Sequence, residues 1–204
     1  MVDLVASLDP ERVRERYEAL CAEAGPGVTV VVATKYVPDE LMAVLATAGV
    51  AVVGENRAQD LERKQARYGA AFRWHFIGHL QSNKARVLNR TCELVHSVGS
   101  ESAAVRVTVP ALVEVNLSGE ASKSGIAPGE LAGLLALGTD IRGLMTMPPL
   151  ADDAEASRPT FRRLRELAAA HGLPELSMGT TQDWRVAVEE GATLIRVGSA
   201  LFRL

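Results

Sequence analysis

The sequence predicts a single (β/α)8 TIM barrel that spans residues 1–204. Short apolar runs alternate eight times with amphipathic segments along the chain. Unbroken apolar runs of strand length are typical of strands buried on both faces, as in a parallel sheet. The connections are too short to hold a second domain, and eight alternating units favour closure into a barrel. An open doubly wound sheet is the alternative, but such a sheet usually has fewer strands.

The predicted elements follow one another regularly. The first helix has an N-cap at Asp9 and a proline at its first position, and it ends at Gly25. Strands are predicted at residues 28–34, 50–53, 73–77, 94–98, 111–116, 141–145, 175–178 and 193–197. Helices are predicted at residues 10–24, 41–48, 57–68, 81–89, within 99–107, and at 128–137, 152–171 and 183–190.

Composition excludes several classes of protein. With 48% hydrophobic and 23% charged residues the chain is ordinary for a globular protein, and a net charge of −3 predicts no nucleic-acid partner. No apolar run approaches the ~20 residues of a membrane span, and the first residues do not read as a secretory signal. Cys21 and Cys92 lie far apart and are typical of free thiols in a reducing compartment. We expect a cytoplasmic protein without a membrane partner.

The first predicted strand delivers Lys35 to its carboxyl end. In α/β barrels ligands bind at this rim. A lysine held there partly away from water would have a lowered pKa, and its neutral amine could attack a carbonyl. The alternative is a lysine whose stem lies on apolar surface while its ammonium reaches water.

Polar and small residues gather at the strand ends, whereas the strand interiors are apolar. These residues are Lys35, Glu55, Asn56, His75, Gly78, Ser97, Asn116, Met145, Ser177, Gly179, Arg196, Gly198 and Ser199. The ends of strands seven and eight are rich in Gly and Ser, at the usual position of the phosphate site in this fold. Arg196 would add a fixed positive charge there. Taken singly, a plain turn at Gly198, a buried ion pair of Arg196 and a helix cap at Glu55 and Asn56 remain alternatives.

Other chemistry is poorly supported by the sequence. His75 and His79 flank a glycine without an acidic third ligand, so no metal site is predicted. His96 and Ser97 lack a partner acid for a nucleophilic triad. A lysine at strand one together with a phosphate site at strands seven and eight suits a phosphorylated aldehyde held as a Schiff base.

Seven segments carry a family resemblance, and together they cover nearly the whole chain. They are residues 32–35, 54–60, 74–84, 115–125, 143–149, 176–179 and 197–202. The chain resembles the YggS/PROSC family of pyridoxal phosphate homeostasis proteins. That family is similar in fold to the N-terminal barrel of alanine racemase, the type III fold of pyridoxal phosphate proteins.

The resemblance implies a pyridoxal 5′-phosphate site. The residues that it assigns to the cofactor are Lys35, Asn56, Ser177, Gly179, Arg196, Gly198 and Ser199. It implies that Lys35 forms the internal aldimine and that Asn56 lies against the pyridine ring. It also implies that Ser177, Gly198 and Ser199 bind the phosphate.

The implied function is to carry and buffer pyridoxal phosphate in intracellular vitamin B6 homeostasis, without evident turnover. Apo forms of pyridoxal phosphate-dependent enzymes are candidate recipients, and we expect a monomer. Arg196 belongs near the cofactor, at the ring nitrogen or at the phosphate. At the ring nitrogen its charge would keep that atom unprotonated and weaken the electron sink that amino-acid chemistry needs.

Two other functions remain open. A racemase-type enzyme needs a second acid/base, which alanine racemase takes from an added β domain that these 204 residues leave no room for. A barrel that binds another phosphorylated metabolite is the third reading. The chain also departs from the family pattern, because the helix after strand four is short and Thr180-Thr181-Gln182-Asp183 replaces the usual Met-Ser and acidic residues.

Overall fold

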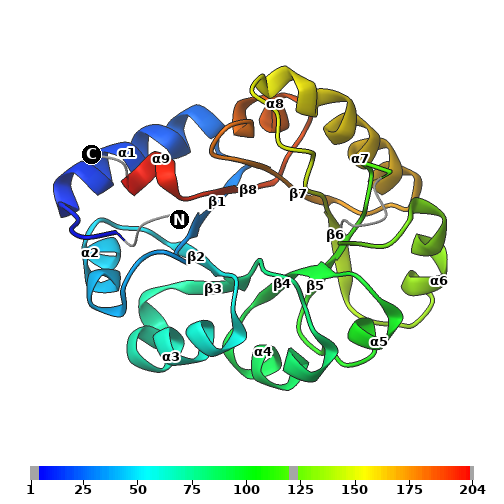
Figure 1. Ribbon diagram of the computed structural model, residues 1–204, viewed down its shortest axis with the longest axis horizontal. Coiled ribbons are helices and arrows are strands. Elements are labelled where there is room, and N and C mark those ends of the chain that lie inside the picture. The colour runs from blue at the N-terminus through cyan, green and yellow to red at the C-terminus, as the bar shows by residue number, and fades with distance from the viewer. Residues whose placement is uncertain (1–4, 120–123, 203–204) are drawn as a thin grey trace.

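The computed structural model describes residues 5–119 and 124–202. Within these residues eight parallel strands form a closed barrel, and helices surround it (Figure 1). Each strand pairs with the next one in sequence, and β8 closes the ring by pairing with β1, where Leu194 lies opposite Thr29. The predicted (β/α)8 barrel is confirmed.

The strands are β1 (Thr29–Ala33), β2 (Val52–Glu55), β3 (Arg73–Phe76), β4 (Leu94–Val98), β5 (Ala111–Glu114), β6 (Ile141–Met145), β7 (Glu175–Thr180) and β8 (Leu194–Val197). The α-helices are α1 (Pro10–Ala24), α2 (Met42–Thr47), α3 (Ala58–Tyr68), α4 (Ala85–Thr91), α5 (Glu101–Ala104), α6 (Leu131–Leu135), α7 (Arg158–Ala170), α8 (Trp184–Glu189) and α9 (Ser199–Phe202). Short 3-10 turns are η1 (Asp39–Leu41), η2 (Gly69–Ala71), η3 (Ser82–Lys84), η4 (Pro128–Glu130) and η5 (Ala154–Ser157).

The first helix forms as its sequence predicts. The Asp9 carboxylate accepts a hydrogen bond from the backbone N–H of Glu11 at 2.9 Å, which satisfies one of the free donors of the first turn. Gly25 ends α1 with a φ of 90°, a conformation that residues with a Cβ rarely adopt. Local sequence therefore sets both ends of this helix.

The second strand begins two residues later than predicted. Val50 is buried, but its N–H donates to Leu45 O at 3.0 Å and closes the end of α2. Pairing with β3 starts only at Val52, which lies opposite Arg73. An apolar run shows that a segment is buried, but it does not show where sheet pairing begins.

Apolar side chains form two separate cores. The larger core lies between the strands and the surrounding helices. The smaller one fills the inside of the barrel, and its buried residues are Val31, Val52, Leu94, Leu112, Met145 and Leu194. Since side chains alternate along a strand, residues at even spacing from these share the inward side. Arg196, two residues after Leu194 in β8, therefore lies on the inward side, and Lys35, Asn56 and Gly198 follow the ends of β1, β2 and β8.

The helices differ in length. The helix after β4, α5, has only four residues, as short as the sequence indicated, and the Ser100 hydroxyl caps it by accepting from the N–H of Ala103 at 3.2 Å. Among the helices of the described residues, none is long and apolar enough to cross a membrane.

Candidate functional site

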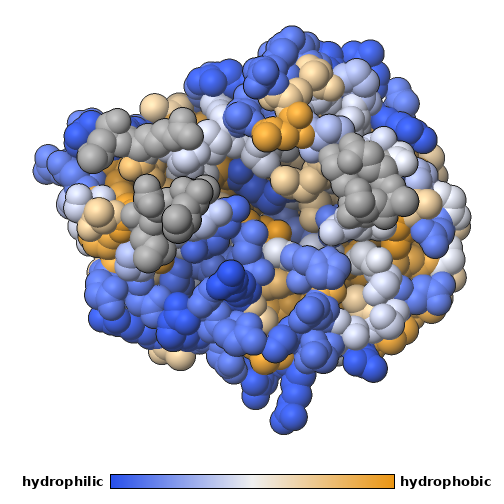
Figure 2. Space-filling view, in the orientation of Figure 1, coloured by the Kyte–Doolittle hydropathy of each residue, from blue (hydrophilic) through white to orange (hydrophobic). Residues whose placement is uncertain are grey.

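The carboxyl-terminal face of the barrel is hollowed over its centre. Figures 1 and 2 view the molecule from this face, and Figure 2 shows hydrophilic residues within the hollow. A second hollow, of about 540 Å³, lies at the opposite end, and the residues lining it include Thr29, Arg73 and Glu175 at the strand starts. A predicted site residue can therefore lie near either of two hollows, one at each end of the barrel.

Lys35 lies two residues beyond the end of β1, at the carboxyl-terminal face, and its side chain is exposed. Its Nζ is 4.9 Å from the centre of the Tyr36 ring, a cation–π contact that contributes little at an exposed position. The expectation that this ammonium is partly withdrawn from water is wrong for this structure. The amine is instead accessible at the carboxyl-terminal face.

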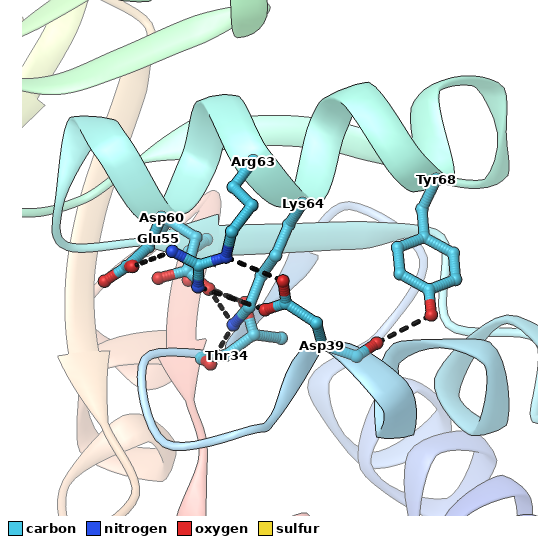
Figure 3. A network of polar contacts seen from close by, with 8 residues as sticks. Thr34, Asp39, Glu55, Asp60, Arg63, Lys64 and Tyr68 are labelled. Carbon is cyan, nitrogen blue, oxygen red and sulfur yellow. Dashed lines mark hydrogen bonds and ion pairs between the residues drawn. The ribbon is translucent and has the colours of Figure 1, made fainter.

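A buried ion pair fixes the backbone just before Lys35. Lys64 reaches from α3 to the end of β1, where its Nζ donates to Thr34 O at 2.9 Å and to Glu55 Oε1 at 2.6 Å (Figure 3). The Thr34 hydroxyl donates to the same carboxylate oxygen at 2.7 Å. The peptide carbonyl of Thr34, which joins it to Lys35, is therefore held from outside the barrel.

The sequence pattern does not reveal this ion pair. Residues 57–68 form a helix rich in charged residues, yet the Lys64 side chain is only 3% exposed. Glu55 was expected at the rim or in a helix cap, but its carboxylate turns outward to meet α3. Helical spacing from the apolar Leu61 was the available signal, because Lys64 follows it at i+3 on the same helix face.

A second set of contacts ties the segment after Lys35 to α3. Arg63 donates to Asp39 Oδ2 and to Asp60 Oδ1, each at 2.7 Å, and the Tyr68 hydroxyl donates to Asp39 O at 2.6 Å (Figure 3). The Arg63 guanidinium lowers the pKa of the Asp39 carboxyl. Both sides of Lys35 are thus anchored to one helix.

Asn56 lies where β2 ends, and its side-chain Oδ1 is buried without a hydrogen-bond partner. The loop after β3 approaches closely, because a Cβ at Gly78 would lie 2.0 Å from Asn56 O. An unpartnered buried acceptor is costly to a protein, so its presence at the rim of a hollow suggests a partner from outside the chain.

Arg196 is a buried cation whose hydrogen-bond acceptors are all neutral. Nη1 donates to Ser177 O at 2.9 Å and to Ser177 Oγ at 2.5 Å, and Nη2 donates to Thr146 O at 3.1 Å and contacts Met147 Sδ at 2.8 Å. Burial lowers the pKa of Arg196 to about 10, so the guanidinium stays charged at neutral pH. Within the described residues no carboxylate forms an ion pair with it. The alternative that Arg196 forms a buried ion pair is therefore wrong among the described residues.

The ends of β7 and β8 lie together, as the predicted phosphate site requires. Gly179 has a φ of +89°, and a Cβ there would come within 2.6 Å of Ala187 Cβ on α8. The Gly198 N–H contacts the Thr181 hydroxyl at 3.4 Å, and Ser199 begins α9. Only glycine fits at Gly179, so this position serves the close packing of α8 on β7.

Three other predicted rim residues are buried. The Ser177 hydroxyl is fully buried beneath Arg196, and the Ser97 hydroxyl donates to Gly78 O. His75 is buried inside the barrel, with Nδ1 3.0 Å from His96 Nε2, and it lines the hollow at the amino-terminal end. In the described ranges, no group of three or more His, Cys, Asp or Glu side chains is placed to hold a metal ion.

Glu114 at the end of β5 is a further buried group, and the sequence pattern does not single it out. Burial raises the pKa of its carboxyl, and this effect is opposed by the charges of His79 and Arg196. A single acidic residue at the end of an apolar strand is also typical of a surface position, so only the fold distinguishes it. The structure brings Lys35, Asn56, Arg196 and the two glycine-containing strand ends to one face, with Glu114 close to Arg196.

Comparison with known proteins gives a consistent result. Residues 8–204 match the family described as alanine racemase, N-terminal domain. The pyridoxal phosphate homeostasis protein of Aquifex aeolicus is 38% identical over 94% of both chains. That of Pseudomonas aeruginosa is also 38% identical, over 94% of this chain and 90% of its own.

Solved structures agree in fold. PipY of Synechococcus elongatus, solved with and without PLP, has a TM-score of 0.84 and 34% identity over 93% of this chain and 99% of its own. Alanine racemase of Corynebacterium glutamicum has a TM-score of 0.74 at 17% identity, over 97% of this chain and 61% of its own, and shows the fold alone. The chain therefore belongs to the alanine racemase N-terminal domain family, and within it to the pyridoxal phosphate homeostasis proteins.

Proposed function

We propose that this protein binds pyridoxal 5′-phosphate at the carboxyl-terminal face of its barrel and carries it within vitamin B6 homeostasis. The observation that carries the proposal is an exposed amine, Lys35, on the same face as a buried guanidinium, Arg196, that has only neutral acceptors. The homologous PipY structure, which is solved with PLP bound, supports the same ligand here.

The residues present fit this ligand. An aldehyde supplies a carbon that a lysine amine can attack, and Lys35 is the amine that the fold presents at the rim. The buried charge of Arg196 suits the electron-rich ring nitrogen or the phosphate. The unpartnered Oδ1 of Asn56 suits a group lying against the end of β2. The phosphate is assigned to the strand ends at Gly179, Gly198 and Ser199.

The family resemblance assigns Ser177 to the phosphate. Its side chain is fully buried, and its hydroxyl already contacts Arg196 and His96. We therefore assign to Ser177 an action on the cofactor through Arg196, while a direct contact of its hydroxyl with the phosphate stays a prediction.

We propose a carrier without enzyme-like turnover of amino acids. Racemisation needs two groups that exchange protons on opposite faces of a carbanion. Lys35 can supply one face. His75, which the sequence placed at the rim, is enclosed in the barrel beside His96. The guanidinium of Arg196 stays protonated and accepts no proton.

One observation favours the second candidate function, a racemase-type enzyme. Glu114 is buried, and burial raises the pKa of its carboxyl, as is common for carboxyl groups that act in proton transfer. If the protein exchanges amino-acid protons, Glu114 is our candidate for the second proton-transferring group beside Lys35.

Absorption spectroscopy and proton exchange test the two functions together. Purified protein incubated with pyridoxal phosphate should gain a visible absorption band, and borohydride should fix the label on one lysine-containing peptide. The loaded protein should exchange the Cα proton of L- or D-alanine in deuterated water slowly or not at all, as followed by NMR. It should also transfer the cofactor to an added apoenzyme. Exchange at several per second that is lost in Glu114→Gln would establish the enzyme instead.

A further inference from the structure

Two buried histidines connect the Arg196 guanidinium to the opposite end of the barrel. Arg196 Nη1 lies 2.5 Å from Ser177 Oγ, and that oxygen lies 2.8 Å from His96 Nδ1. His96 Nε2 in turn lies 3.0 Å from His75 Nδ1. All four residues are at most 6% exposed, and they come from β8, β7, β4 and β3. The chain of contacts therefore crosses the barrel interior to the amino-terminal hollow, which His75 lines.

Arg196 determines which group donates in each of these hydrogen bonds. A guanidinium can only donate, so the Ser177 oxygen must accept from it. The Ser177 hydroxyl has one proton of its own to give. Within the described residues, the remaining contact of this oxygen is His96 Nδ1. Ser177 therefore donates to Nδ1, and Nδ1 of His96 is unprotonated.

The same direction continues through the imidazole rings. Burial lowers the pKa of His96 well below its ordinary value and that of His75 to about 3, so both rings are neutral at neutral pH. A neutral His96 with a bare Nδ1 carries its proton on Nε2 and donates to His75 Nδ1. His75 then carries its proton on Nε2, an atom that is buried and unpartnered.

The reverse direction is less favourable. If His96 donated to Ser177, the serine oxygen would accept twice and its own buried proton would have no acceptor. His75 Nε2 is unpartnered in either direction, so reversal adds an unsatisfied donor without gaining a bond. The geometry therefore selects one tautomer for each ring.

We propose that His96 and His75 are positioning residues for Arg196. By accepting the Ser177 proton, His96 keeps the serine lone pairs turned toward the guanidinium, and His75 fixes the tautomer that lets His96 accept. The inference rests on the proposed function, because Arg196 there belongs to the pyridoxal phosphate site. It adds a role for two histidines that do not touch the cofactor.

Imidazole NMR tests the tautomers directly. Protein freed of pyridoxal phosphate and labelled with ¹⁵N-histidine is studied by long-range proton–nitrogen correlation between pH 5 and pH 8. Assignments come from His75→Gln and His96→Asn. Both buried rings should show a protonated Nε2 and a bare Nδ1 throughout, and the signals of the exposed His171 serve as a reference in the same spectra. A proton on Nδ1 of His96, or titration of either buried ring in this range, would overturn the proposal.

Binding of pyridoxal phosphate tests the positioning role. His96→Asn keeps an oxygen that can accept the Ser177 proton, whereas His96→Leu does not. Loss of one buried hydrogen bond corresponds to an affinity loss of about tenfold, expected for His96→Leu, with His96→Asn within about threefold of wild type. Leu88 on α4 is fully buried, so Leu88→Ala should lower the stability of the fold. It is the control for an effect of stability on binding, and it should bind pyridoxal phosphate like wild type. Equal losses in the Leu and Asn variants, or no loss in the Leu variant, would refute positioning.

A double variant separates this role from a merely structural one. Ser177→Ala removes the oxygen through which His96 acts, so His96→Leu should have no further effect on affinity in that background. Ser177→Ala alone also serves if His96→Leu fails to fold, because it should weaken binding by a similar factor. Additive losses would show that His96 acts by another route. If wild-type protein binds no pyridoxal phosphate, the proposed function fails, while the tautomers can still be read by NMR.

Discussion

The Lys64 ammonium and the Glu55 carboxylate form a buried ion pair, 2.6 Å apart. The same ammonium donates to the carbonyl of Thr34, the residue before Lys35. The two side chains are 3% and 1% exposed. Removing two charges from water costs about as much as their attraction returns, so the pair contributes little net stability. Its effect is geometric, since it joins the end of β1 to β2 and α3 at the point where the chain presents its candidate nucleophile.

Breaking this pair should be costly. Lys64→Met leaves the Glu55 carboxylate buried without its partner, and we expect a loss of about 3–5 kcal/mol in the free energy of unfolding. Urea denaturation followed by circular dichroism measures it. The double variant Lys64→Met with Glu55→Gln should recover part of the loss, because no unpaired charge remains.

Arg63→Met is the matched control for Lys64→Met. It removes ion pairs from the same helix, but the Arg63 side chain is 55% exposed, and exposed pairs contribute at most about 1 kcal/mol. Equal losses for Arg63→Met and Lys64→Met would show that burial of the Lys64 pair has no energetic consequence.

Lys35 should carry the cofactor. Lys35→Ala is expected to abolish the visible absorption band of bound pyridoxal phosphate and the borohydride-fixed label at that residue, because the alanine has no amine to bond the aldehyde. Mass spectrometry of the reduced protein locates the label. An unchanged band would move the attachment to another lysine, with Lys84 and Lys123 as candidates. Lys84→Ala is the control and should retain the band, whereas Lys123 lies outside the described residues.

The phosphate should lie at the start of α9. Ser199→Asp places a carboxylate beside it, and repulsion between like charges should weaken pyridoxal phosphate much more than unphosphorylated pyridoxal. Ser199→Asn, which has a similar shape without charge, is the control. Titration of each variant with the two ligands measures the difference. An equal loss for both ligands would place the phosphate elsewhere.

Stability should fall as the pH drops through the range in which an unfolded histidine gains a proton. In the folded protein burial lowers the pKa of His75 from 6.5 to about 3. Between pH 6.5 and pH 3 only the unfolded chain takes up this proton. The free energy of unfolding is therefore highest above pH 6.5 and falls as the pH decreases toward 3. At pH 5 it amounts to a loss of about 2 kcal/mol relative to pH 7.

Urea denaturation at pH 7 and pH 5 tests this linkage. His75→Gln should lose less stability than wild type over this interval, because glutamine does not titrate. His171→Gln, at an exposed position, should behave like wild type. The same pH dependence in all three proteins would mean that His75 is not held neutral by burial.

Much of the fold could be read from local patterns. The alternation of apolar runs with amphipathic segments predicted the barrel, and β4 and β6 fall at their predicted residues. The strand ends predicted which face would carry Lys35, because parallel strands all deliver their carboxyl ends to one side. The start of β2 was missed, since hydrogen-bond pairing with β3 rather than hydrophobicity decides it.

The candidate site divides in the same way. Sequence determined its chemical content, namely a lysine after β1, an arginine in β8 and glycines at two strand ends, because residue type and strand period are local properties. Only the tertiary structure decided which of these side chains meet. Contacts such as Lys64 with Thr34, or Ser177 with His96, join residues 30 and 81 positions apart in the chain. No local pattern encodes them, because they exist only once closure of the barrel brings separate strands and helices together.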